Sequence, residues 1–140
     1  MKTFFTIFFS AFCFLAQAQV ARTATQTILA TNVATINLSL NSENIEIIET
    51  KGSRIIIETK IALEGVTNLT LLDFVISSGR YELINKLDQT NQSISVSRKK
   101  NKNSLIVKGE EVKENLSYKI LVPETIKFVN TKSSATASIN

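Results

Sequence analysis

The stretch NIEIIETKGSRIIIETKI, residues 44–61, contains two isoleucine-rich runs. Isoleucine is β-branched, and such side chains favour an extended backbone over a helix. The runs at residues 44–50 and 54–60 are separated by Lys51-Gly52-Ser53. Gly52 is able to adopt the positive φ that a tight hairpin or a bulge requires. We therefore predict two similar strands joined at Gly52.

The strand pattern continues on both sides of this stretch. Apolar or alternating runs of the same kind occupy residues 36–40, 81–84, 93–97, 104–108, 116–122 and 125–129. Residues 93–97 and 104–108 should face each other across a polar tip. Pro123 cannot donate to a strand ladder, so it marks the end of the run at 116–122. These patterns predict a mainly β fold, made of antiparallel hairpins or forming the start of a β-solenoid.

One short segment breaks the β pattern and predicts a helix near residues 68–78. Asn68 is a good N-cap, and Gly79 stands where a C-cap is expected. Between them Leu69, Leu72, Val75 and Ile76 fall on one helical face. The alternative is a buried strand through Phe74-Val75-Ile76.

The first eighteen residues, MKTFFTIFFSAFCFLAQA, have the layout of a secretory signal peptide. Lys2 precedes an apolar run of about a dozen residues, and Ala16-Gln17-Ala18 is a small-x-small cleavage site. A membrane-spanning helix needs about 20 apolar residues, so we expect cleavage after Ala18 and no transmembrane span in the mature chain. Cys13 raises the alternative of a lipoprotein, but the bulky Phe12 before it does not fit that signal. The expected destination is the periplasm, the cell surface or the medium.

Cleavage leaves a lead-in segment at residues 19–34, with room for one weak strand, and a single β-rich domain at residues 35–140. No Pro- or Gly-rich linker divides that domain. Residues 130–140 are small and polar, with alternation at Ala135, Ala137 and Ile139. If a solenoid ends there, its open edge should self-associate, or the natural chain should continue further.

The composition excludes several classes of function. Beyond Phe14 the chain has no Cys, His or Trp. That excludes a disulfide framework, a His- or Cys-ligated metal site, and any mechanism that needs an imidazole or a thiolate. Ser97 and Lys100 have the Ser-x-x-Lys spacing of some acyl enzymes, but the partner motifs of those enzymes are absent. We predict a protein that is not an enzyme and binds no cofactor or metal.

Three pieces of the chain resemble a known family. They are residues 44–61, GRYEL at 79–83, and SYKILVPETIKFV at 117–129, which leads into a Ser/Thr/Ala-rich tail. Together they are similar to adhesin-like domains of secreted bacterial proteins, such as the auto-transporter head GIN domain, over about residues 44–140. The resemblance implies β-solenoid repeats after a strand that ends in Val-Pro, and an adhesive role. It supplies no site residues.

The densest charge cluster is Arg98, Lys99, Lys100 and Lys102, placed between two expected strands. As a hairpin tip it is either a solvated turn or a site for an anionic ligand. Glu110, Glu111 and Glu114 would partly neutralise its field. No aromatic residue is interleaved to stack bases, so we expect no specific nucleic-acid binding.

Two functional hypotheses follow. The first is an exported, non-catalytic envelope or surface domain, adhesin-like, that contacts an envelope polysaccharide or another protein through its β surface. The alternative is a small periplasmic module that binds an anionic envelope polymer through the basic tip.

Overall fold

The computed structural model describes residues 19–40, 44–101, 103–131 and 136–137. In these residues the elements follow in this order: β1 (Ala21–Leu29), β2 (Thr35–Ser39), β3 (Ile45–Thr50), β4 (Arg54–Leu63), α1 (Leu69–Ser77), β5 (Leu83–Asp88), β6 (Ser93–Arg98), β7 (Ile106–Val107), β8 (Glu110–Glu111), β9 (Glu114–Pro123), β10 (Lys127–Thr131) and β11 (Thr136–Ala137). The prediction of a mainly β fold with one short helix is therefore confirmed.

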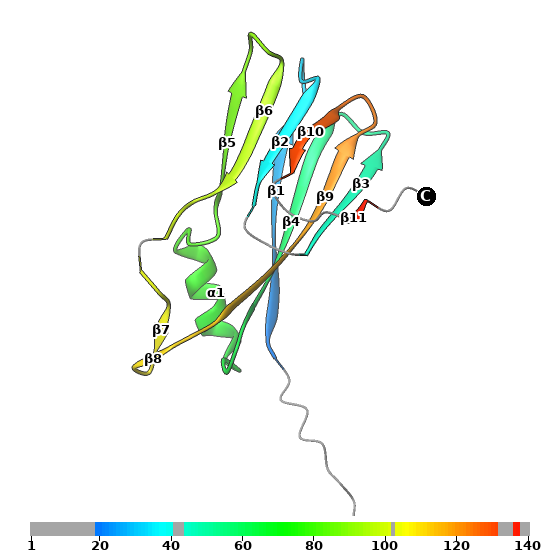
Figure 1. Cartoon of the computed structure of the whole chain (residues 1–140). Helices are drawn as coiled ribbons and strands as arrows, with labels where there is room; N and C mark the ends of the chain where they lie inside the picture. Colours follow the sequence, from blue (N-terminus) through cyan, green and yellow to red (C-terminus); the bar gives the residue numbers. More distant parts are fainter. Residues whose placement is uncertain (1–18, 41–43, 102, 132–135, 138–140) are drawn as a thin grey trace, which may run out of the picture.

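The strands form two mixed sheets and a small hairpin (Figure 1). The first sheet has the order β1-β4-β9-β3-β11, and the second has the order β10-β2-β6-β5. Several pairs are parallel: β3 with β9, β11 with β3, β2 with β6, and β10 with β2. The third unit is the hairpin of β7 and β8. The described residues form no solenoid, so that alternative is wrong for this part of the chain.

The core explains why two layers form. Every second residue of β4 is buried, and so are Tyr118, Ile120 and Val122 of β9; Ile55, Ile57 and Ile120 have 0% exposure. They pack against Ile36 of β2 and Val96 of β6 from the second sheet. A strand with one apolar face needs a second layer to cover that face.

The helix covers the part of the first sheet that the second sheet leaves free. Leu72 and Val75 of α1 pack with Ile61 and Leu63 at the end of β4. The Asn68 side chain accepts hydrogen bonds from the Thr70 and Leu71 amides at 2.9 and 3.4 Å. Gly79 follows the helix with φ +78°. The expected caps are thus both present.

Phe74 and Leu69 differ from the predicted burial. The alternative of a buried strand would have placed Phe74 in an apolar run in the core, but 70% of Phe74 is exposed. Leu72 and Val75 point inward, and Phe74 lies between them in sequence on the opposite face of the helix. Leu69, at the first turn, is 43% exposed.

The predicted hairpin at Gly52 is wrong, because β9 lies between β3 and β4. The strands on either side of β9 are about 10 Å apart, which is two interstrand spacings. Three extended residues can span that distance, and Lys51–Ser53 do so in a bend where Gly52 has no positive φ. Both isoleucine-rich runs are strands, but they pair with β9 and not with each other.

Segments near both ends of the chain pair with strands of the first sheet. The segment expected as a lead-in contains β1, which pairs along all nine residues with β4. At the other end, Thr136–Ala137 pair in parallel with Glu46–Ile47. The rest of the alternating tail, and the expected signal peptide, lie outside the described residues.

Candidate functional site

The basic cluster is not a hairpin tip. β6 pairs with β5 and β2, whereas β7 pairs only with β8. Residues 93–97 and 104–108 therefore do not face each other, and the residues after Arg98 form a connection from the second sheet toward the β7–β8 hairpin (Figure 1). The expected pairing failed because β2, which is distant in sequence, offers a longer apolar partner to β6 than the two-residue β7 does.

This connection is tied to the segment that follows the helix. The Lys99 amide donates to the Glu82 carbonyl at 3.4 Å, and Asn101 Nδ2 donates to the Arg80 carbonyl at 3.1 Å. Arg80 Nη2 donates in return to the Asn103 carbonyl at 3.0 Å. The basic residues are consequently held against a fixed backbone, unlike those of a solvated turn.

Together these segments line an open hollow of about 440 Å³, called here the basic hollow. Its lining residues are Arg80, Arg98, Lys99, Lys100, Asn101, Asn103, Ser104 and Glu114. Four basic side chains and one carboxylate leave a net charge of +3 on this lining. Three of the four predicted site residues, Arg98, Lys99 and Lys100, are thus brought together, while Lys102 lies outside the described residues.

Glu114, at the start of β9, organises the floor of the hollow. Its Oε1 accepts from Arg80 Nε at 2.7 Å and from the Tyr81 hydroxyl at 2.6 Å, and its Oε2 accepts from Arg80 Nη2 at 2.9 Å. The side chains of Arg80 and Glu114 are only 15% and 17% exposed. A bidentate, charge-assisted pair in such a place is among the stronger side-chain interactions in proteins.

Charge and burial set the protonation states in the hollow. Burial raises the pKa of Glu114, but the hydrogen bonds from Arg80 and Tyr81 and the nearby positive charges outweigh that effect, so its pKa lies below the usual 4.5. Burial and the hydrogen bond to Glu114 raise the pKa of Tyr81 well above 10.0. Near neutral pH the carboxylate is therefore ionised and the phenol is neutral.

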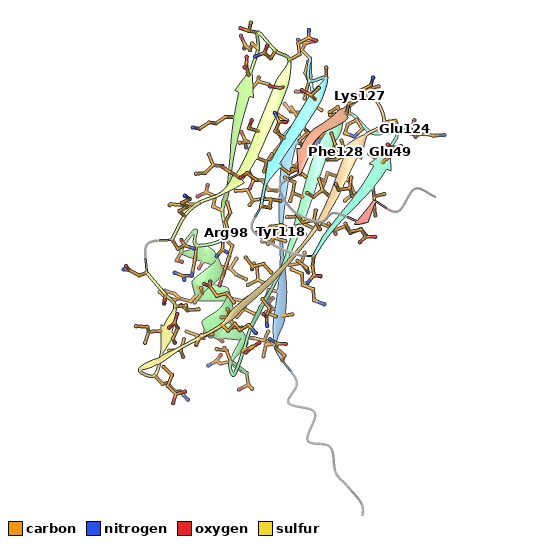
Figure 2. The ribbon with its side chains drawn as sticks, in the orientation of Figure 1. Glu49, Arg98, Tyr118, Glu124, Lys127 and Phe128 are labelled. Carbon is orange, nitrogen blue, oxygen red and sulfur yellow. The ribbon has the colours of Figure 1, made fainter. Side chains whose placement is uncertain are left out.

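Arg98 lies at the end of β6, close to two tyrosines. Its guanidinium carbon is 5.6 Å from the centre of the Tyr81 ring. Figure 2 labels Arg98, at the end of β6, and Tyr118, on β9. Burial raises the pKa of Tyr118, and the nearby charge of Arg98 opposes that rise. The nearest carboxylate oxygen is Glu114 Oε1, 3.8 Å from Arg98 Nη2, which is too long for a hydrogen bond.

Sequence reasoning predicted Arg98 as a site residue but missed its inward placement and the pairing of Glu114 with Arg80. Glu114 was recognised as a neutralising charge, but its pairing with Arg80 joins residues 34 apart, and no local pattern indicates it. Arg98 did carry a signal. Ile94 and Val96 alternate on the buried face of β6, and continuing that period places Arg98 on the same face.

A metal site needs several ligand side chains close together, and a membrane-spanning helix needs a long apolar segment. No three His, Cys, Asp or Glu side chains among them are placed to hold a metal ion. None of the helical segments that the structure describes is long and apolar enough to cross a membrane.

Comparisons with known proteins give a distant structural match. No family model matches the chain, and no curated protein matches its sequence. One similar solved structure is that of a "putative cell adhesion protein" from Clostridium sporogenes, with a TM-score of 0.39 and 10% identity. The match covers 78% of this chain and 47% of the other, so this chain spans about half the length of that protein. At that score the likeness does not establish a common fold, and the function must be argued from the site.

Proposed function

We propose that this protein is an exported, non-catalytic domain of the cell envelope, adhesin-like in role, that binds an anionic polysaccharide in the basic hollow. The observation that carries the proposal is the hollow itself. A run of basic residues is fastened along its wall, and only one carboxylate offsets the charge. The adhesin-like role and export rest on the sequence, through the signal peptide and the family resemblance.

The lining favours a polysaccharide over a lipid surface. Asn101, Asn103 and Ser104 stand beside the cations and offer amide and hydroxyl groups to sugar hydroxyls. The volume of the hollow falls within the range of small-ligand sites, about 300–1,000 Å³. A membrane-binding surface would instead combine basic residues with a broad apolar face.

Retention on immobilised polygalacturonate tests the proposal. The variant Arg98→Ser/Lys99→Ser/Lys100→Ser should lose retention, and retention of the wild type should fall between low salt and 0.15 M, where exposed charges are screened beyond about 8 Å. A matched control is Arg54→Ser/Lys60→Ser/Lys119→Ser, which removes the same charges from exposed positions on β4 and β9. The control should still bind.

Three results would contradict the proposal. Salt-insensitive retention that survives the triple substitution would transfer the contact to a β surface. Equal losses in both triple variants would reduce the effect to net charge. Binding to phosphatidylglycerol vesicles but not to any acidic polysaccharide would mean that the ligand of the basic hollow is a membrane surface and not a polysaccharide.

A further inference from the structure

We infer that Arg98 is the specificity residue of the basic hollow and grips a single oxyanion group of the ligand, a carboxylate or a phosphate carried on a sugar. This inference rests on the proposed function, and it assigns unequal roles to side chains that share the same charge.

The two arginines of the basic hollow differ in how many of their N–H donors are already bonded within the protein. Arg80 already uses its Nε and Nη2 on Glu114 and on the Asn103 carbonyl. Among the described residues, the Arg98 guanidinium makes no hydrogen bond. Arg98 Nη2 is 3.8 Å from Glu114 Oε1, which is an ion pair but too long for a hydrogen bond, and the Nε of Arg98 is buried without an acceptor. A guanidinium short of acceptors in a partly buried place is stabilised by an entering anion.

The Arg98 side chain is also held in place by its surroundings. The Arg98 side chain is 22% exposed and lies over the Tyr81 ring, whose hydroxyl is fixed by Glu114. An arginine held in one plane presents its terminal N–H groups as a fork that matches two oxygens of a carboxylate or phosphate. Lys99 and Lys100 are exposed at the rim, so they supply a field that depends little on ligand geometry.

Glu114 follows as a positioning residue. It is saturated by Arg80 and Tyr81, and it keeps Arg80 turned away from the ligand while it fixes the ring beneath Arg98. Near neutral pH the hollow therefore recognises its anion through one arginine, with Arg80 acting as structure.

The test compares charge-conserving substitutions by calorimetric titration of the exported protein. The probes are tri-galacturonate for the carboxylate and glucose 6-phosphate for the phosphate, with maltotriose as the neutral control. Arg98→Lys should weaken the preferred probe about tenfold, because the ammonium keeps the charge and loses the fork. Lys99→Arg and Lys100→Arg should change the affinity less than twofold. The probe whose affinity falls more in Arg98→Lys identifies the oxyanion that Arg98 binds.

The outcomes separate this inference from the proposed function. If Arg98→Lys binds both anionic probes as the wild type does, the hollow acts through its field alone, and the inference fails while the proposed function stands. If the wild type binds no anionic probe and no polymer, both fail. Should Arg98→Lys be unstable, the wild-type Arg98 Nε–Hε resonance still decides: its shift on saturation with the probe must exceed the shifts of the Lys99 and Lys100 backbone amides, and an unmoved resonance overturns the inference.

Discussion

Glu114 connects parts of the chain that are far apart in sequence, because Arg80 and Tyr81 follow the helix whereas Glu114 opens β9. Removing one partner of such a pair leaves the other charge mostly buried, which costs more than the pair contributes. The surface pair Arg22–Asp73 has similar geometry at 2.7 Å, but its side chains are 44% and 51% exposed. Exposed pairs of that kind contribute little to stability, because water screens the two charges.

We expect Glu114→Gln to lower the free energy of unfolding by about 2 kcal/mol at pH 7. A carboxyl whose pKa is lower in the folded than in the unfolded state stabilises the fold above its unfolded pKa, and that contribution is lost as the pH falls through the folded value. The pKa of Glu114 lies below 4.5, so the difference between wild type and Glu114→Gln should shrink as the pH drops below about 4.5.

Urea denaturation at pH 7, 5 and 3 measures this difference, with Asp73→Asn as the control. The control should lower the free energy of unfolding at pH 7 by clearly less than Glu114→Gln does, because water screens the exposed pair. A Glu114→Gln variant as stable as wild type at pH 7, or a difference that grows in acid, would show that the carboxylate does not hold the hollow together.

The strands show what a pattern of residues can and cannot specify. Alternation and β-branching predicted β2, β3, β4, β6, β9 and β10, and the Asn68 cap and the spacing of Leu72 and Val75 predicted the helix, because these signals are local. β1 was expected only as a weak strand, and the run expected at residues 81–84 shares only Leu83 and Ile84 with β5. The order of strands is not local. β9 pairs with β3 and β4 through residues that are 51 to 73 positions apart in the sequence, and Val or Ile at those positions would suit several neighbours equally. The same limit hid the basic hollow, whose walls come from three separate segments.

The helix offers a direct test of the local signals. Asn68→Ala removes the acceptor for two helix amides, and should lower the free energy of unfolding by about 1 kcal/mol. Thr67→Ala, which removes an exposed hydroxyl one residue earlier, should change it by less than about 0.5 kcal/mol. Thermal denaturation of both variants decides, and equal effects would mean that the cap contributes nothing.

The basic hollow can act at the cell envelope only if the protein is exported. If residues 1–18 are the expected signal peptide, the mature chain starts at Gln19, two residues before β1 begins. Mass spectrometry of the protein from its native host should find that terminus. An intact Met1, or a lipid on Cys13, would remove the basis for placing the hollow in the periplasm or outside the cell. Self-association through the C-terminal edge stays a prediction, and light scattering across a concentration series measures it.

In the basic hollow, positive charge, a backbone held by hydrogen bonds and open space occur together. The most direct test is a ¹H–¹⁵N NMR titration of the protein with tri-galacturonate at low salt. We predict saturable shifts of the Lys99–Asn101 amides and the Arg98 Nε–Hε signal, all reduced at 0.15 M salt, with the β7–β8 hairpin unmoved. Shifts confined to the outer face of the first sheet, or none at any residue lining the hollow, would contradict anion binding at this site.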